Sequence, residues 1–587
     1  MSNLPNNNGW PSNNEPNHDG RSGRWAFWHS RPWVRQLAFL LVMLVGIGYL
    51  LRSSISNTAI QRIDAGLLHS VQRSTLAEPV AMVDREFANA WREHGLEPTN
   101  DADDYLVMRR LSLALTGMPP SLEQIRWVEQ IPVDQRLDQY LAHLLQNKPT
   151  HDYVAERLTR SWIGAEDGPF IVFRRQRFVA WLSQQLAENR RYDAVVREML
   201  TARGLWTDHG PVNFFSAQAD PDKDNRLDLV RVTGRVSRNF LGMRIDCLQC
   251  HNDFTGATEF GSSEERREGL QTDFHSIASF FGQLSLAPTG LHDRLEAPTY
   301  EVELLGDKEP TPIPAAVPFG NEWANWEDAE LQSSDLPLRN HFADWLTNQN
   351  NRPFARAFVN RMWAQLLGRP LVEPIDNIPL HGPFPPGLEV LTDDFIASGY
   401  DIRRLISVIV HSQPFLRDSR GQHELTPAHE EHWASFPATK LRPEQMAGTI
   451  SQVASLIALD DSTHIITQLV RFGEESDFMT RYGDLGDQEF EQDGETVSQR
   501  LLLLNGAMAS ERLRGEGGLP FNSVVQIERL GQTPDQIVEL LYLIVLTRKP
   551  TRHELEVITP VIEEDRRAGI EDLLAVLVNS SEALWNH

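Results

Sequence analysis

Both cysteines of this chain lie in one short string, DCLQCHND, at residues 246–253. Cys247, Cys250 and His251 form a Cys-x-x-Cys-His pattern, which is the attachment pattern of a c-type haem. Two thiols at this spacing form thioethers with the vinyl groups of the porphyrin, and the adjacent imidazole takes one axial position on the iron. The pattern therefore predicts one covalent haem c, with His251 as the proximal iron ligand.

Two other uses of the same residues stay open. The thiols of Cys247 and Cys250 could form a reversible disulfide or remain a reduced pair. They could also bind zinc together with His251, although zinc would need a fourth ligand. Thioredoxin-like redox chemistry is disfavoured, because it needs a βαβ setting around the two cysteines and the neighbouring sequence predicts helices.

A six-coordinate haem needs a second axial ligand on the face opposite His251. His275 is the candidate distal ligand. Met243 is disfavoured because it precedes Cys247 by four residues and would lie on the same local helix. His275 also has a simpler interpretation, as a core or solvent-facing histidine that binds nothing.

Three further clusters of polar residues carry weaker signals. Residues 220–225 begin like a calcium-binding EF-hand loop, but Asn225 replaces the required glycine and Arg231 replaces the required bidentate glutamate, so calcium is not expected. The second cluster, a candidate metal site, consists of His423, His429 and His432. The third cluster, a candidate acid/base site, consists of Asp376, His381, Asp393 and Asp394. An exposed polar loop accounts better for the histidine cluster. Helix capping and turn chemistry account equally well for the acid/base cluster.

The composition limits the partners that the chain can have. It has 587 residues, of which 81 are acidic and 55 basic, and its formal net charge is −26. This length suits two or three domains at roughly 100–200 residues each. Phosphate binding needs clustered lysines and arginines, so no nucleic-acid partner is expected.

The first 52 residues predict a disordered tail followed by a membrane anchor. Residues 1–32 are rich in Asn, Pro, Ser and Gly, and residues 37–51 contain no charge. The apolar stretch is long enough to span a membrane, so residues 33–52 are the predicted transmembrane signal-anchor. Arginines precede it, which by the positive-inside rule puts the tail in the cytoplasm and the bulk of the chain on the periplasmic side of the inner membrane. A cleaved signal peptide is the alternative, but no Ala-x-Ala site follows.

The rest of the chain predicts a mainly α fold. Two helical ectodomains, residues 53–283 and 337–587, are expected to be joined by a Pro-rich, partly extended linker at 284–336, where prolines break any helix. The cysteine motif should lie at or just past a helix end, because residues 227–245 form one apolar helical face that leads into it. Capping signals predict helix starts at Ser121, Thr533 and Thr551.

Several strings, in their order along the chain, resemble a known pair of domains. DYLVMRRLSLALTGMPPSLEQI and RNFLGMRIDCLQCH, followed by DFHSIASFF, resemble the planctomycete cytochrome-c-type domain of unknown function. RNHFADWLTNQNNRPFARAFVNRMWAQLLG and LYLIVLTRKPTRHEL resemble its usual C-terminal companion domain. The resemblance implies an exported, mostly helical two-domain protein with a candidate haem at Cys247, Cys250 and His251. Relatives usually read CHDHPF, whereas Asn252 and Asp253 follow here and the second histidine and the proline are missing.

The sequence thus predicts a membrane-anchored, exported, c-type cytochrome-like protein that carries one haem and passes electrons to a redox partner protein. The missing His-Pro favours the alternative, a haem-free binding or scaffold protein of the cell envelope in which Cys247 and Cys250 form a disulfide. A hydrolase in the second domain is a further alternative. An electron-transfer or binding role is expected ahead of a hydrolytic one.

Overall fold

The computed structural model describes residues 65–164, 173–220, 226–256, 258–262, 264–296, 299–320, 335–457, 459, 490 and 523–587. The chain divides into two units, Met1–Arg62 and Ile63–His587, and every described element belongs to the second. The predicted tail (1–32) and signal-anchor (33–52) therefore lie outside the described residues. Within the described part, no helix is both long and apolar enough to cross a bilayer.

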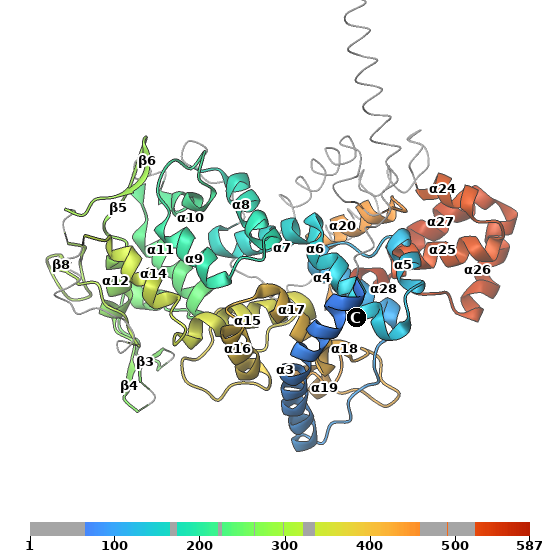
Figure 1. Ribbon diagram of the computed structural model, residues 1–587, viewed down its shortest axis with the longest axis horizontal. Coiled ribbons are helices and arrows are strands. Elements are labelled where there is room, and N and C mark those ends of the chain that lie inside the picture. Colours follow the sequence, from blue (N-terminus) through green and yellow to red (C-terminus); the bar gives the residue numbers. More distant parts are fainter. Residues whose placement is uncertain are drawn as a thin grey trace, which may run out of the picture. The chain divides into compact units, whose positions relative to one another are not determined.

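The prediction of a mainly helical fold is confirmed (Figure 1). Up to residue 283 the helices are α3 (Ala65–Glu93), α4 (Asp104–Thr116), α5 (Leu122–Glu129), η1 (Val133–Gln135), α6 (Arg136–Gln146), α7 (Lys148–Ile163), α8 (Arg175–Ala187), α9 (Tyr192–Thr201), η2 (Gly210–Val212), α10 (Asn213–Ser216), α11 (Leu229–Val236), η4 (Ser237–Leu241), η5 (Asp246–Gln249) and α12 (Gln271–Ser279). Later helices are α14 (Leu338–Leu346), α15 (Arg352–Leu367), α16 (Leu388–Ala397), α17 (Ile402–His411), α18 (Gln413–Leu416), α19 (Pro427–Glu431), α20 (Pro443–Val453), α24 (Ser523–Leu530), α25 (Pro534–Leu546), α26 (Arg552–Glu564), α27 (Arg566–Val578) and α28 (Ser581–Leu584).

The predicted helix starts are confirmed by their capping geometry. At Ser121, Thr533 and Thr551 the hydroxyl accepts a hydrogen bond from the backbone N–H three residues later, and the side chain of that later residue accepts one in return. These reciprocal bonds satisfy amide groups that a helix end otherwise leaves unpaired. Gly117, at φ +70°, ends α4, and a side chain there would collide with the ring of Tyr153.

The described strands form two-stranded antiparallel pairs. They are β1 (Ala219–Asp220) with β2 (Arg226–Leu227), β3 (Glu259–Gly261) with β4 (Arg266–Glu268), β5 (Leu284–Ala287) with β6 (Gly290–Asp293), β7 (Glu301–Val302) with β8 (Thr311–Pro312), and β9 (Thr439–Lys440) with β10 (Trp585–Asn586). Four of these strands, β5 to β8, lie in the segment predicted as the linker. Hydrogen bonds fasten that segment to earlier elements: Gly204 and Leu291 exchange backbone bonds, and the Ser279 hydroxyl donates to the carbonyl of Ile313.

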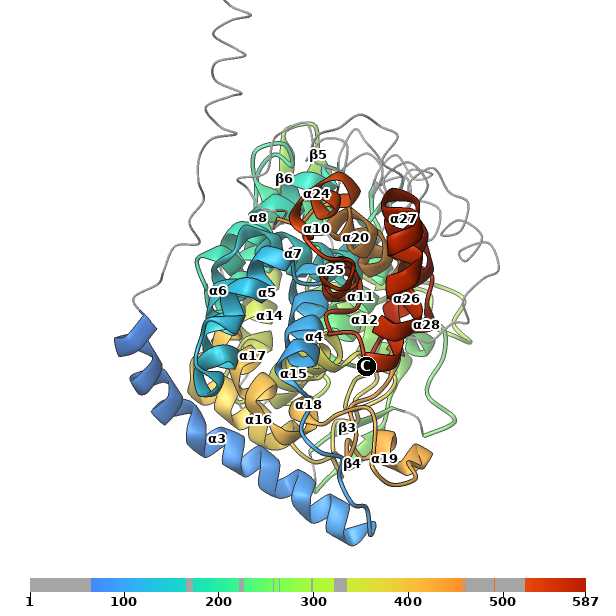
Figure 2. The same ribbon diagram turned by 90° about the vertical axis from the view of Figure 1, so that its right-hand side faces the viewer.

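Helices from the two halves of the chain pack against each other. α3 lies along α16 and α17, as both views show (Figures 1 and 2). α4 contacts α15, and its C-terminal carbonyls accept hydrogen bonds from Gln365 (to Ala114, 2.6 Å) and Gln445 (to Leu113, 2.9 Å). The arrangement of α4 among later helices is a tertiary feature that helix periodicity does not encode.

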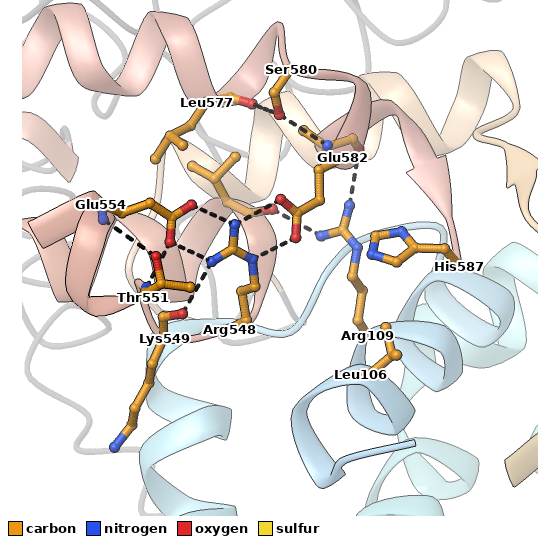
Figure 3. Close-up of polar contacts among 12 residues, drawn as sticks. Leu106, Arg109, Arg548, Lys549, Thr551, Glu554, Leu577, Ser580, Glu582 and His587 are labelled. Carbon is orange, nitrogen blue, oxygen red and sulfur yellow. Dashed lines mark hydrogen bonds and ion pairs between the residues drawn. The ribbon is translucent and has the colours of Figure 1, made fainter. Parts of the chain in front are cut away.

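Among the C-terminal helices, Arg548 lies between two carboxylates, those of Glu554 and Glu582 (Figure 3). Its Nη2 donates to Glu554 and to Glu582, each at 2.8 Å, and its Nε donates to Glu582 at 2.5 Å. The hydrogen bonds from Arg548, together with those from Thr551, lower the pKa of Glu554 to about 2 against the opposing effect of its partial burial. Glu554 thereby joins the start of α26 to the end of α25.

The lowered pKa of Glu554 makes part of the stability depend on pH. Because the folded-state pKa is about 2 and the ordinary value is 4.5, this contribution is complete above about pH 4.5 and is lost as the pH falls toward 2. Glu554→Gln should lower the free energy of unfolding at pH 7 by about 1–2 kcal/mol, since water partly screens the pair, and should flatten the acid limb of a plot of thermal midpoint against pH.

The matched control is Glu556→Gln on the same helix. Glu556 pairs with Arg552, whose side chain is 93 % exposed, so its removal should leave the acid limb unchanged. Identical acid limbs for the Glu554 and Glu556 variants would contradict the assignment.

Candidate functional site

The cysteine motif occupies one turn of 3-10 helix, η5 (Asp246–Gln249), and the residues directly after it. This turn follows the helical stretch of α11 and η4, as predicted. Cys247 and Cys250 are both exposed, and neither is in a disulfide. Partial burial of its thiol and the nearby charges of Asp253 and Asp246 raise the pKa of Cys247. That thiol is therefore protonated at neutral pH, unlike the low-pKa cysteines of disulfide oxidoreductases.

His251 presents one ring nitrogen without a protein partner. Its Nδ1 lies 2.7 Å from the carbonyl oxygen of Asn252, and because a carbonyl only accepts, Nδ1 carries the proton. The lone pair is then on Nε2, which has no hydrogen-bond partner among the described residues. The ring also stacks on Phe254, with centroids 5.6 Å apart, and Phe254 is 75 % exposed. A hydrogen bond of this kind from Nδ1 is the usual way in which a protein orients a metal-binding imidazole.

His275, the predicted distal ligand, lies on α12 directly behind the cysteine turn. Its Nε2 donates to the carbonyl of Gln249 at 3.0 Å, and its Nδ1 accepts from the hydroxyl of Tyr300 at 3.0 Å. The side chain is buried, and this burial lowers the pKa of His275, so the ring is neutral. In this arrangement His275 anchors the turn, and it would have to release one of these two bonds to bind iron. Its role as a ligand stays a prediction.

Asn252 and Asp253, the two residues after His251, hold the loop in place. Asn252 Oδ1 accepts the backbone N–H of Gln271 at 2.8 Å, at the start of α12. The buried carboxylate of Asp253 accepts hydrogen bonds from the backbone N–H of Thr255 and of Thr258. Although burial raises the pKa of Asp253, the hydrogen bonds from Thr255 and Thr258 outweigh it and hold the pKa below its ordinary value. Asn252 and Asp253 thus both have a structural role in this loop.

An ion-pair network joins the cysteine turn to the second half of the chain. Arg238 Nε donates to Asp246 at 2.8 Å, and Arg244 Nε donates to Asp376 at 2.5 Å. Arg238 also lies 3.9 Å from Asp376, and the backbone N–H of Ile378 donates to Gly242 at 2.7 Å. The sequence singled out Asp376 for acid/base chemistry, whereas the structure makes it the partner of two arginines beside the motif. Nothing in the local sequence signals this pairing, since the partners are more than a hundred residues apart.

The structure does not gather the other predicted acid/base residues around Asp376. Asp393 pairs with Arg352 at 2.6 Å and Asp394 with Arg404 at 2.8 Å. His381 makes a backbone hydrogen bond with Gly261 on β3, and burial, with the charge of Arg266, lowers its pKa. Each carboxylate is thus neutralised by a different arginine, which favours a structural role.

The other candidate metal residues also find protein partners. His423 and His429 lie with their Nε2 atoms 3.3 Å apart, and His429 Nδ1 accepts the backbone N–H of Thr426. The ring of His432 stacks on that of His94. Across the residues that the structure describes, no group of three or more His, Cys, Asp or Glu side chains is placed to hold a metal ion. Of the calcium-like loop, residues 221–225 lie outside this part, and Arg231 is exposed on α11.

Comparison with protein families finds two matches along the chain. PSCyt2, a protein of unknown function (DUF1549), matches residues 82–283, and PSD1, a protein of unknown function (DUF1553), matches residues 338–468. The matches confirm the two resemblances and their order, and together they cover more than half of the chain. The cysteine turn and α12 lie within the first match, and Asp376 lies within the second. No curated protein and no solved structure matches the chain.

Proposed function

We propose that this chain, in which a PSCyt2 domain of unknown function precedes a PSD1 domain of unknown function, is a c-type cytochrome-like electron carrier. One observation carries the proposal. Cys247 and Cys250 are exposed and unpaired on a single turn, and they are followed by His251, whose tautomer leaves Nε2 open. These three residues fit the attachment of a haem.

The bonds of the attachment would join these side chains to the porphyrin. Cys247 and Cys250 would hold the haem through thioether bonds, each made by addition of a thiol across a vinyl double bond, with the thiol proton going to the other vinyl carbon. His251 Nε2 would bind the iron, and the hydrogen bond from Nδ1 to the carbonyl of Asn252 would keep the ring oriented. When bound, the haem supplies a one-electron redox couple.

The proposal includes the location and the partner expected from the sequence. Residues 33–52 would anchor the chain in the inner membrane, with the cysteine turn on the periplasmic side. The uncharged segment and the arginines before it support this topology. The electrons would pass to or from a redox partner protein at the exposed turn.

The test is covalent haem on the full-length chain, produced together with a haem-attachment system. We expect a mass increase of one haem per chain, one iron per chain, and the absorption band of a haem with two thioether bonds. Cys247→Ser/Cys250→Ser should remove all three signals. His275→Gln is the matched control and should keep the attachment, because His275 contributes no covalent bond. A wild-type chain that is free of iron and has two titratable thiols would overturn the proposal.

A haem-free scaffold is the second candidate, and the hydrogen bonds of the loop favour it. Asn252, Asp253 and His275 hold the turn in place through bonds to other protein groups alone. In such a protein the two thiols would form a local disulfide. A mass lower by two hydrogens in the iron-free wild-type chain, restored by a reductant, would support the scaffold over the cytochrome.

A further inference from the structure

An open cavity at the protein surface, far along the chain from the cysteine motif, lies where the N-terminal end of α4 meets the C-terminal helices. Its volume is about 790 Å³, and Tyr105, Arg420, Lys549, Trp585 and His587 are among its lining residues. Small-molecule sites typically have volumes of roughly 300–1,000 Å³. The cavity therefore has room for a small ligand, and the chemistry of its walls indicates which kind.

One wall is an ion-pair cluster in which each charged group is paired with another group of the protein (Figure 3). All five N–H groups of Arg548 donate to protein acceptors: the carboxylates of Glu554 and Glu582 and the backbone carbonyl of Lys549. Glu582 is thereby neutralised, although it lines the cavity. Asp103, another lining carboxylate, accepts the backbone N–H of Leu106 as the N-cap of α4. The acids of the wall are therefore committed to protein donors.

Two cations of the lining have only loose partners. The Arg420 side chain is 65 % exposed and lies 3.6 Å from Asp418, and the Lys549 side chain is 55 % exposed and lies 3.9 Å from Glu539. Both distances exceed those of direct charge-assisted hydrogen bonds, which are about 2.7–2.9 Å. Either cation can turn toward a bound anion at little cost. A chain with a net charge of −26 thus presents two available positive charges at one cavity.

Two buried arginines add positive charge behind the same wall. Arg109 and Arg110 on α4 are fully buried, and their hydrogen bonds go to backbone carbonyls, among them those of Val545, Ala583 and Phe415. Arg110 Nε also donates to the main-chain oxygen of His587, a lining residue, at 2.9 Å. Burial, and after it the charge of Arg109, lowers the pKa of His587, which is what a positive local potential does to an imidazole.

Two aromatic side chains complete the lining. The hydroxyl of Tyr105 donates to Glu129 at 2.7 Å, so its polar end is already satisfied by the protein. Trp585 lies on β10, which is paired with β9, and Lys440 approaches its ring to 5.7 Å from the centroid. Aromatic rings of a ligand pack on such surfaces in offset or edge-to-face geometry.

We propose that this cavity binds a small organic anion in which a carboxylate is attached to a flat ring. Arg420 and Lys549 attract the carboxylate, and Tyr105 and Trp585 pack against the ring. The site is independent of the cysteine motif, so it stands whether or not the chain carries haem. A ligand here would contact both the N-terminal end of α4 and the C-terminal helices, and it would raise the thermal midpoint by an amount that grows with the logarithm of its concentration.

The test is calorimetric titration of the full-length chain with benzoate, benzamide and acetate. Benzoate should bind at least about tenfold more tightly than benzamide, which lacks the charge, because hydrogen bonds to charged groups contribute about 1.5–3 kcal/mol. Acetate, which lacks the ring, should also bind more weakly than benzoate. Arg420→Gln and Lys549→Gln should each weaken benzoate binding several-fold and leave benzamide unchanged.

Arg552→Gln is the matched control, because Arg552 is 93 % exposed on α26 and does not line the cavity. It should bind benzoate as the unchanged chain does. Arg420 and Lys549 are exposed, so their variants should fold, which circular dichroism would verify. Equal affinities for benzoate and benzamide would overturn the proposal and indicate a neutral ligand. An equal loss in all three variants would show that benzoate only screens surface charge.

Discussion

Arg339→Met is expected to lower the free energy of unfolding by about 3–5 kcal/mol, because it leaves a buried carboxylate without its main partner. Arg339 and Asp293 have side chains that are 1 % and 3 % exposed. Two parallel hydrogen bonds join them, from Nε at 2.7 Å and from Nη2 at 2.8 Å, and Nη1 donates to the carbonyls of Leu200 and Ala202. The pair fastens α14, at the start of the second half, to α9 and to the hairpin β5–β6. Urea unfolding followed by tryptophan fluorescence measures the loss.

The chain offers a control that shares the same carboxylate. Arg203 donates to Asp293 at 2.7 Å, but its side chain is 55 % exposed. Arg203→Met should therefore cost no more than about 1 kcal/mol. Arg339→Met/Asp293→Leu should recover part of the loss, since it removes the buried charge that the single variant strands. Equal losses in the two single arginine variants would show that burial does not decide the strength of this pair.

Trp363→Ala should be the second strongly destabilising change, by about 3–5 kcal/mol, because it opens a cavity in the core. Trp363 on α15 is fully buried. Its ring stacks on Phe87 of α3, with centroids 5.5 Å apart, and meets Trp433 edge-on at 5.2 Å. The side chain therefore lies where the first helix of the described chain packs on the second half. Thermal unfolding followed by circular dichroism measures the effect.

A graded control separates the loss of ring packing from the removal of the indole N–H. The indole N–H of Trp363 is buried and has no hydrogen-bond partner among the described residues. Trp363→Phe keeps a ring against Phe87 and removes that unsatisfied donor, so it should cost only about 1 kcal/mol. A similar loss for the phenylalanine and alanine variants would contradict the packing explanation.

The helix starts could be predicted because capping is local. Ser121 with Gln124, and Thr551 with Glu554, are only three residues apart, so their side chains reach each other's backbone in any environment that allows a helix. The attachment pattern at Cys247, Cys250 and His251 is local in the same sense, and its place after a helical stretch followed from the periodicity before it. The described part of the predicted linker shows the limit: its prolines excluded helices, but they did not indicate hairpins fastened to Gly204 and Ser279.

The sequence alone determined the helical class, the order of the two domains and the residue types at the cysteine turn. Each of these is encoded by residues that are close together in the chain. The partners of those residues came only from the tertiary structure. His275 has hydrogen bonds to Gln249 and Tyr300 on its two ring nitrogens, and Asp376 accepts one from Arg244. None of these partners is close enough in the sequence for a local pattern to predict it. The free energy of burying a polar group depends on which distant residues surround it, and packing alone decides which residues those are.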